Sequence, residues 1–367
     1  MRISFLLLFI VVIINAKYMD NYSCEECHEK ISEEFKNSVH AKSFFTDELH
    51  RKIALKANST KYECARCHMP SANNLQDLIT GKAKPDKHNK TNTDAIGCYF
   101  CHTIAYVKKS HRFNLNTKAK QAKGYKPTLF GRLTNPDDTD KHSSVKNPIY
   151  GKMACLGCHS HKLNENNVTI FKAMNDNQDS LECIKCHMPS IRGGNEKMNK
   201  KARTHHVSHK FLGIRDKEFR ATGVDINITL NKNSINVKLT NKMAHPLIIQ
   251  PARAKYLEIK IKRDNKTIWR NYKNKPSEDK QGYFAFSFKK DGKKVIIPTY
   301  ATSKTVNNLD AKTSKTLIYK TVSLEKGDIV ELYFWVRLAK DDCTKVINLK
   351  DKSFLKPMLI KKVTKKY

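Results

Sequence analysis

The decapeptide YECARCHMPS at Tyr62–Ser71 recurs as LECIKCHMPS at Leu181–Ser190. Both copies contain the pattern Cys-x-x-Cys-His, which occurs five times and accounts for ten of the 11 cysteines. At this chain's Cys and His frequencies, roughly 0.01 chance matches are expected in the whole sequence. Five copies are far more than chance explains, so the pattern has a chemical role. The copies are Cys24–His28, Cys64–His68, Cys98–His102, Cys155–His159 and Cys183–His187.

Cys-x-x-Cys-His is the attachment signature of c-type haem. Two thiols three positions apart form thioethers with one porphyrin, and the following His becomes the proximal ligand of its iron. The sequence thus predicts five covalently bound haem c groups. The predicted attachment cysteines are Cys24, Cys27, Cys64, Cys67, Cys98, Cys101, Cys155, Cys158, Cys183 and Cys186, and the predicted proximal ligands are His28, His68, His102, His159 and His187.

Two other uses of paired cysteines fit less well. Zinc sites need four ligands from paired knuckles, and they do not require a His directly after every pair. Disulfides suit an exported protein, but Cys-x-x-Cys pairs are more often redox-active than structural. Cys343 remains outside the pattern and is expected to be a buried free thiol, with an intermolecular disulfide as the alternative.

The first residues, MRISFLLLFIVVIINA, contain one Arg and an apolar run too short to span a bilayer. Residues 1–16 are therefore predicted to be a secretory signal peptide, which places the protein in the periplasm. Haem attachment outside the cytoplasm agrees with this prediction.

The composition is strongly basic and poor in apolar residues. The net charge is +34, and only 39% of the residues are hydrophobic. Nucleic acid is an improbable partner of an exported chain. The charge instead favours acidic redox proteins and peripheral contact with an anionic membrane surface. The low apolar content suggests that the porphyrins themselves provide much of the core.

The chain is predicted to have two domains after the signal peptide. Residues 17–215 hold every haem motif and form a helical and irregular cytochrome c domain. A helix is expected over Glu29–Phe45, where Ile31, Phe35 and Val39 follow a helical period. Met69 and Met188, directly after motif histidines, are expected to pack against the protein, with the following prolines turning the chain.

Residues 216–367 show the alternation of β-strands. Apolar residues alternate from Val224 to Leu239 around a turn at Asn231–Asn233, which predicts a β-hairpin. Alternation recurs around Leu257–Ile261 and Val330–Leu338. The predicted fold class is α+β, with the haem domain followed by an antiparallel β-sandwich.

The sixth iron ligands decide between electron transfer and catalysis, because a catalytic haem keeps one axial position open. From the residues alone, His50 and His88 lie in charged surroundings and are expected at the surface. Three histidines lie within five residues at His205, His206 and His209, so at least one of them is expected to be an iron ligand. His245 is expected to be a hydrogen-bonded histidine at the end of a β-strand. The ten remaining candidates are His40, His50, His88, His111, His142, His161, His205, His206, His209 and His245.

Residues 24–215 resemble the multihaem c-type cytochromes related to the tetrahaem electron carrier of ammonia oxidation. More distant relatives are the pentahaem nitrite reductases and the octahaem hydroxylamine oxidoreductases. The resemblance rests on EKISEEFKNSVHAKSF after His28, the two CHMP sites, IGCYFCHTI, KHSSVKNPIYGKMACLGCHS and SHKFLG. It implies distal ligation by His40, His142, His209 and His245, with His205 or His206 supplying the fifth. The Cys-x-x-Cys-Lys site of the nitrite reductases is absent.

Three functions compete, of which the last is a non-redox binding or structural role in which the haems only stabilise the fold. The first is an electron carrier between a membrane quinol dehydrogenase and a soluble cytochrome or reductase, for which no catalytic residue is assigned. The alternative is an oxidoreductase that acts on a small nitrogen or sulfur oxyanion, or on hydroxylamine, at one five-coordinate haem. Tyr106, His111 and Arg112 lie near a haem motif and are its candidate proton donors. The electron carrier is favoured.

Overall fold

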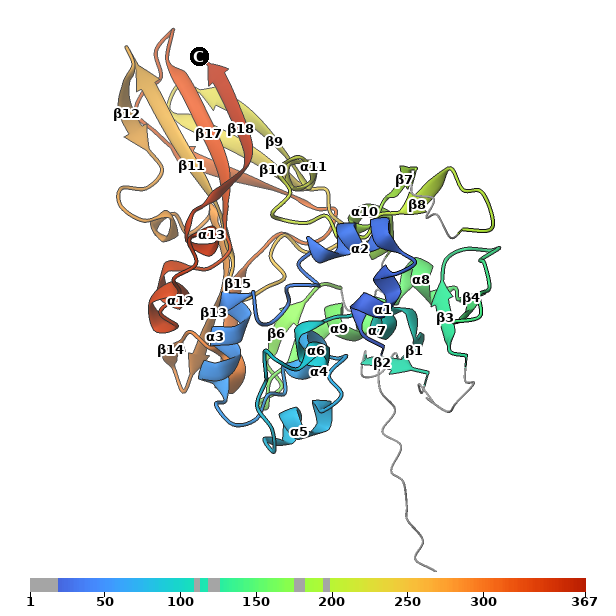
Figure 1. The fold of residues 1–367 in the computed structure, drawn as a ribbon. Coiled ribbons are helices and arrows are strands. Elements are labelled where there is room, and N and C mark those ends of the chain that lie inside the picture. Colours follow the sequence, from blue (N-terminus) through green and yellow to red (C-terminus); the bar gives the residue numbers. More distant parts are fainter. Residues whose placement is uncertain (1–18, 109–112, 118–125, 175–181, 194–198) are drawn as a thin grey trace, which may run out of the picture.

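The computed structural model describes residues 19–108, 113–117, 126–174, 182–193 and 199–367. The chain changes character near residue 215 (Figure 1). Short helices and two-stranded ribbons precede that point, and long antiparallel strands follow it. A mixed helix-and-strand architecture with antiparallel sheets in the C-terminal part is thereby confirmed. The predicted signal peptide lies outside the described residues.

The N-terminal part is built from helices of four to ten residues. Helices this short are not stable alone and depend on what packs against them. They are α1 (Asn21–Glu25), α2 (Glu29–Lys36), α3 (Glu48–Ala57), α4 (Ala65–His68), α5 (Leu75–Thr80), α6 (Lys90–Thr93), α7 (Cys98–His102), α8 (Ile149–Lys152), α9 (Leu156–His159) and α10 (Cys183–His187).

Four two-stranded ribbons connect these helices. Three ribbons are antiparallel, and the pair β3–β4 is parallel. The strands are β1 (Ile104–Lys108), β2 (Phe113–Asn116), β3 (Thr128–Gly131), β4 (Ser143–Lys146), β5 (His161–Leu163), β6 (Thr169–Lys172), β7 (Ser190–Arg192) and β8 (His205–Val207).

The predicted helix over Glu29–Phe45 is only partly present. Helix α2 ends at Lys36, and residues 37–46 form turns. Phe35 is buried as expected, but Val39 is 54% exposed. Asn37 and Ser38 favour turns over a helix interior, because their side chains compete for backbone hydrogen bonds. The early end redirects the segment that carries His40.

The C-terminal part begins with α11 (Lys217–Thr222) and consists mainly of long strands. The predicted hairpin is confirmed, with Asn231 paired to Ser234 at its turn. The strands are β9 (Val224–Asn231), β10 (Ser234–Asn241), β11 (Ala254–Arg263), β12 (Lys266–Arg270), β13 (Tyr283–Lys290), β14 (Lys293–Val295), β15 (Ser303–Asn307), β16 (Ser314–Lys320), β17 (Ile329–Arg337) and β18 (Met358–Lys366).

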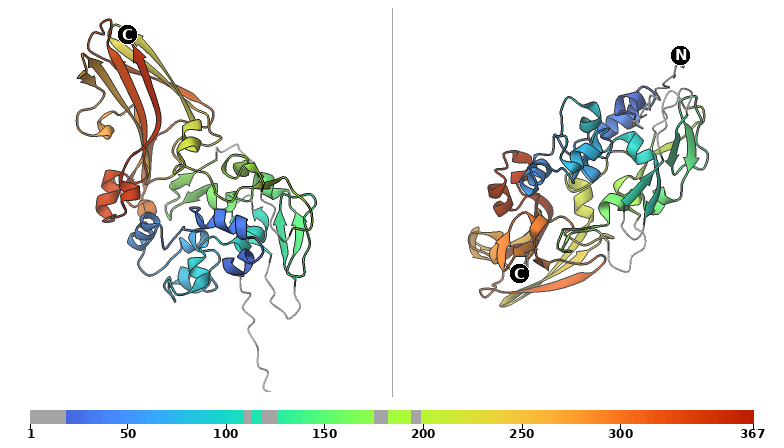
Figure 2. Two further views of the ribbon diagram at one scale, coloured as in Figure 1. Left: turned by 45° about the horizontal axis from the view of Figure 1, so that its top comes forward. Right: turned by 90° about the horizontal axis from the view of Figure 1, so that it is seen from below.

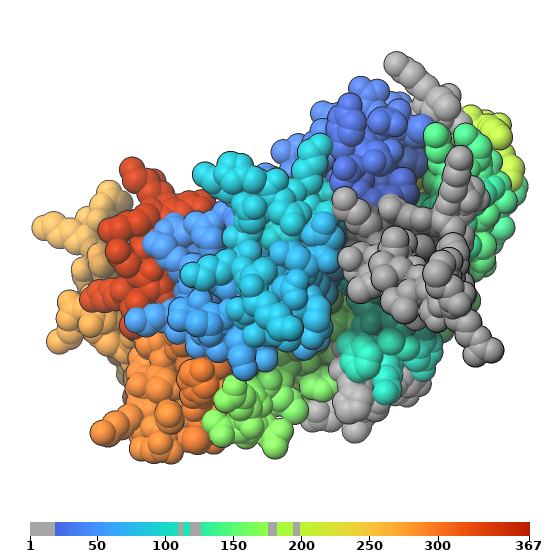
Figure 3. All heavy atoms as spheres, turned by 60° about the horizontal axis from the view of Figure 1, so that its bottom comes forward, coloured from blue at the N-terminus to red at the C-terminus, as the bar shows by residue number. Residues whose placement is uncertain are grey.

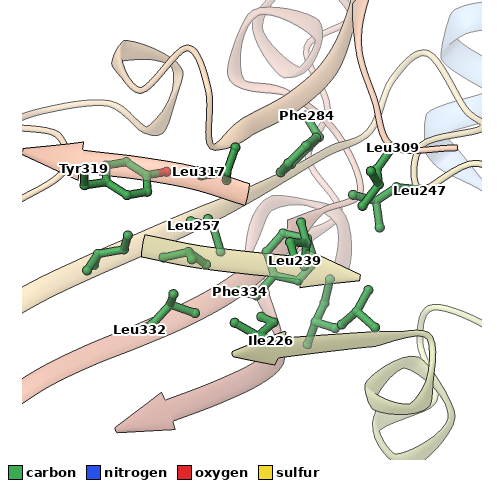
Figure 4. Close-up of a cluster of buried hydrophobic side chains, with 14 of the residues drawn as sticks. Ile226, Leu239, Leu247, Leu257, Phe284, Leu309, Leu317, Tyr319, Leu332 and Phe334 are labelled. Carbon is green, nitrogen blue, oxygen red and sulfur yellow. The ribbon is translucent and has the colours of Figure 1, made fainter. Parts of the chain in front are cut away.

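These strands form two sheets, which share one large apolar core. One sheet has the order β16-β10-β9, and the other the order β14-β13-β11-β17-β18 with β12 and β15 at its margins. Leu239 from the first sheet and Phe334 from the second belong to the same buried cluster (Figure 4). The expectation that protein side chains would not form a large core is wrong for the C-terminal part. Its strands alternate apolar and polar residues, so each sheet buries one apolar face.

The N-terminal part has only small apolar clusters. One gathers around Met69, which is fully buried, and another around Leu156, with Met188 packed against it. The packing predicted for the two methionines is confirmed. No described helix is long and apolar enough to cross a membrane.

Helix α3 joins the two parts of the chain. Leu49 on α3 packs in a cluster with residues of two short C-terminal helices, α12 (Asp341–Val346) and α13 (Lys352–Leu355). The Glu48 carboxylate accepts hydrogen bonds from the backbone N–H groups of Lys350 and Asp351, the latter at 2.6 Å. The blue surface of α3 and the red surface of α12 meet in Figure 3, and Figure 2 shows the strands extending away from this seam.

Cys343 lies inside this seam. It is a free cysteine and only 2% exposed, as the sequence predicts. Burial raises the pKa of its thiol to about 11, so the thiol stays protonated at neutral pH.

Candidate haem-binding sites

Each Cys-x-x-Cys-His segment forms about one helical turn. The backbone N–H of His68 bonds to the Cys64 carbonyl at 3.0 Å, and that of His159 bonds to the Cys155 carbonyl at 2.9 Å. His28 makes the same bond to Cys24 at 2.9 Å. A turn of this kind brings residues i and i+3 to one side of the helix. Both thiols and the imidazole are thereby presented together, as attachment of one porphyrin requires.

A second imidazole lies opposite each motif histidine. The five pairs, with the distances between ring centroids, are His28–His142 at 6.3 Å, His68–His50 at 5.0 Å, His102–His209 at 6.2 Å, His159–His40 at 5.9 Å and His187–His245 at 6.4 Å.

The spacing of these pairs fits an iron held between two imidazoles. A metal–imidazole bond is about 2 Å long, so two imidazoles on opposite sides of one iron have their centroids about 6 Å apart. Four pairs have this spacing, and His50–His68 is closer. Among the described residues, no group of three or more His, Cys, Asp or Glu side chains could hold a metal by itself. Pairs rather than clusters are what a haem needs, because its porphyrin supplies the other four ligands.

Burial keeps most of these imidazoles neutral, which is the form that binds a metal. It lowers the pKa of His40 to about 3. It lowers the pKa values of His68, His159, His209 and His245 to about 4. It also lowers the pKa values of His102 and His142.

Backbone carbonyls orient three of the motif histidines. The Nδ1 atoms of His68, His102 and His187 lie 3.1, 2.8 and 2.6 Å from the carbonyl oxygens of Ser43, Phe130 and Leu212. An Nδ1–H that donates to a carbonyl leaves Nε2 free to bind iron. Carbonyl groups 25 to 28 residues away in the sequence therefore set both the tautomer and the direction of each ring.

The Nδ1 partners of the opposite histidines differ in kind. His209 and His245 lie 2.8 and 2.9 Å from the carbonyl oxygens of Val207 and Pro246. The Ser144 hydroxyl lies 3.1 Å from Nδ1 of His142. A carboxylate, that of Asp47, lies 2.6 Å from Nδ1 of His50. Nδ1 of His40 is buried without a hydrogen-bond partner among the described residues.

The fifth pair differs from the sequence expectation. His50 lies on α3, and Asp47 is the N-cap of that helix. The Asp47 carboxylate accepts a hydrogen bond from the backbone N–H of His50 and also contacts the His50 ring at Nδ1. His205 is exposed on β8. His206 has both ring nitrogens engaged, with Nδ1 at 2.9 Å from the Gly193 carbonyl and Nε2 at 3.2 Å from Glu34.

Neither His205 nor His206 stacks against a motif histidine among the residues that the structure describes. His206 instead serves the site indirectly. The Glu34 carboxylate that it contacts also accepts a hydrogen bond from the backbone N–H of His209 at 2.8 Å. The charged sequence around His50 gave no sign of its position beside His68, although the Asp47-x-x-His50 spacing is a recognisable helix start.

His245 reaches across from the C-terminal part. It lies four residues after the end of β10, whose last residue, Asn241, is fully buried. The Asn241 side-chain amide donates to the carbonyls of His245, Leu309 and Asp310. Asn241 thus fixes the loop that aims His245 at His187.

Thiols of different motifs contact one another. Cys24 and Cys98, Cys67 and Cys158, and Cys155 and Cys183 lie close enough for each pair to shift its partners' pKa values. The motif of His159 therefore adjoins two others, those of His68 and His187. Cys101 of the third motif and Cys155 of the fourth both pack against the apolar cluster around Leu156, so the five sites form one connected group.

Of the three residues considered for catalysis, only Tyr106 lies in the part of the chain that the structure describes. His111 and Arg112 lie outside the described residues, and Tyr106 is 49% exposed on β1. A basic cavity lies beside α3, and Arg51, the residue after His50, is part of its lining. It is lined by Phe45, Arg51, Lys84, Pro85, Asp86, Lys87 and His88.

Comparison with known proteins supports this assignment. Residues 23–103 match the family described as cytochrome c554 and c-prime. The fold is similar to the crystal structure of a penta-heme cytochrome c552 from Thermochromatium tepidum, with a TM-score of 0.74 and 19% identity. The match covers 95% of this chain and 99% of that chain. No curated protein matches the chain. Together these findings support a multihaem c-type cytochrome.

Proposed function

We propose that the protein is an exported pentahaem c-type cytochrome that carries electrons in the periplasm. One observation carries the proposal: an imidazole lies opposite each of the five motif histidines. Two strong axial ligands suit a haem that exchanges electrons without binding a substrate.

In this proposal the chain supplies ten thioether sulfurs and ten imidazoles. His40, His50, His142, His209 and His245 are the distal ligands. The bound haems supply the iron couple that accepts and releases one electron each. The paired imidazoles would hold each iron, and the hydrogen bonds at Nδ1 would orient the rings and tune the potential.

The contacts between thiols support a continuous electron path. The contact of Cys24 with Cys98 connects the first motif to the third. The pKa of the Cys155 thiol is raised by nearby Cys183, by burial and by nearby Cys101, so the third, fourth and fifth motifs are also close. Cys67 connects the second motif to the fourth. Electrons can then enter at one end and leave at another.

The partners follow from charge and location. The net charge of +34 favours acidic redox proteins, with a membrane quinol dehydrogenase as donor and a soluble cytochrome or reductase as acceptor. Nucleic acid is not among the proposed partners, whereas an anionic membrane surface is. Kinship with the tetrahaem carrier of ammonia oxidation, and a β-sandwich arrangement of the two C-terminal sheets, belong to the same proposal.

Electron paramagnetic resonance of the oxidised protein tests the central point. Mass spectrometry first counts the attached haems. Five haems with five low-spin ferric signals are expected. A high-spin signal from one fully incorporated haem would contradict the assignment of five electron-transfer haems.

A second candidate function is reduction or oxidation of a small nitrogen or sulfur oxyanion, or of hydroxylamine. The basic cavity beside Arg51 favours the haem of His68 as its location, because positive side chains attract anions. The close His50–His68 spacing makes this pair the one to examine. Nitrite, hydroxylamine or sulfite is added to the reduced protein, and reoxidation no faster than with free haem eliminates this candidate.

A further inference from the structure

Two buried cations lie at the start of β11. Lys255 is 7% exposed, and its Nζ donates to the carbonyl oxygen of Leu247 at 2.8 Å. The Nε atom of Arg253 is buried and has no hydrogen-bond partner among the described residues. Both side chains belong to the C-terminal part but face the haem-motif segments, because Asp47 acts on Arg253 and the Leu247 that Lys255 contacts follows His245 by two residues.

Among the described residues, neither cation has a carboxylate in an ion pair with it. Burial lowers the pKa of Lys255 to about 7 and that of Arg253 to about 10. Arg215 lies close enough to lower the pKa of Arg253 further, and Asp47 acts in the opposite direction. The Asp47 carboxylate, however, already bonds to His50. Burying a cation without a counter-ion costs several kcal/mol, so such groups are normally paired.

The position of the two cations indicates which anion they pair with. Both are among the charges that lower the pKa of His245, after burial, which is the dominant cause. His245 faces His187 across the space assigned to one haem. A haem brings two carboxylates of its own, the propionates, into a protein interior. A guanidinium binds a carboxylate through two parallel N–H groups, and an ammonium binds it as a point charge.

We propose that Arg253 and Lys255 bind the propionates of the haem held by Cys183, Cys186, His187 and His245. The proposal rests on the proposed function, since it requires that haem. The C-terminal part then provides this haem with an axial ligand and with its counter-charges. A nearby positive charge favours the reduced state, which carries one more electron, so the pair raises the potential of this haem.

Redox titration of the five-haem protein tests the proposal with Arg253→Gln and Lys255→Met. Each variant is expected to lower the equilibrium constant for reduction of one haem about tenfold, which is ~59 mV for one electron, and to shift the other four potentials less. Arg270→Gln is the matched control, because it removes the same charge from exposed β12. It should leave all five potentials in place.

The conservative variant Arg253→Lys keeps the charge but loses the two-pronged contact. It should shift the same potential by less than Arg253→Gln does, and it serves in place of that variant should Arg253→Gln not fold. The proposal is overturned if all five potentials match those of Arg270→Gln in every folded variant. Failure of the proposed function is distinguishable, because it shows in the haem count and spin states of the parent protein before any substitution.

Discussion

The Nδ1 of His50 lies 2.6 Å from Oδ2 of Asp47, so the imidazole that faces His68 is held by a carboxylate. The other opposite histidines have carbonyl or hydroxyl partners at Nδ1, or none among the described residues. A carboxylate makes an imidazole a stronger donor to iron and stabilises the ferric state. The haem of Cys64–His68 should therefore have one of the lower potentials of the five.

Asp47→Asn should raise the potential of that haem. Asparagine caps a helix about as well as aspartate, so α3 is expected to remain in place while the negative charge is lost. The expected rise is on the order of 59 mV, a tenfold change in the equilibrium constant, measured by redox titration. Asp264→Asn, in the exposed turn between β11 and β12, is the control and should change no potential.

His50→Ala and His206→Ala should behave differently. Loss of His50 opens the sixth position of one iron, and electron paramagnetic resonance should then show one high-spin haem. Loss of His206 removes only its contacts with Gly193 and Glu34, at a stability cost of about 1 kcal/mol, with five low-spin signals retained. A high-spin signal in His206→Ala with none in His50→Ala would reverse the assignment.

His245→Ala should convert one haem to high spin while all five stay covalently attached. It should also weaken the association of the two parts of the chain, because an axial bond across the seam is lost. Mass spectrometry, spin-state spectra and limited proteolysis near residue 215 measure these effects. A spectrum and a redox titration identical to those of the parent would reduce His245 to an edge histidine.

Leu49→Ala should loosen the helix that carries His50. Leu49 is 2% exposed in the cluster with Cys343 and Phe354, and truncating a buried Leu costs about 2–5 kcal/mol. Leu55→Ala on the same helix is the control, because Leu55 is 41% exposed and its loss should cost about 0.5 kcal/mol or less. Denaturant unfolding gives the free-energy change, and the redox titration shows whether the potential of the His68 haem shifts only in Leu49→Ala.

Local patterns made part of this structure predictable. The haem motifs are short and strict, and the β9–β10 hairpin follows directly from alternation around Asn231–Asn233. The sequence did not indicate a pairing of His50 with His68, because the two residues come together only when the chain folds. Crowding favoured His205 and His206 in the sequence, yet hydrogen bonds with Thr204, Gly193 and Glu34 occupy them in the structure. The contact of α3 with α12 and α13 joins segments some 300 residues apart, which no periodicity can reveal.

In the proposed assignment, the loop held by Asn241 places His245, the distal ligand for the last haem motif, beyond all five attachment sites in the sequence. During synthesis, every cysteine of those sites emerges before His245 does. Haem attachment can thus be chemically finished while one iron still lacks its second imidazole. That iron can gain His245 only after β9 and β10 fold. A chain truncated before β9 should therefore carry all five haems, with the iron of the last motif lacking its distal imidazole.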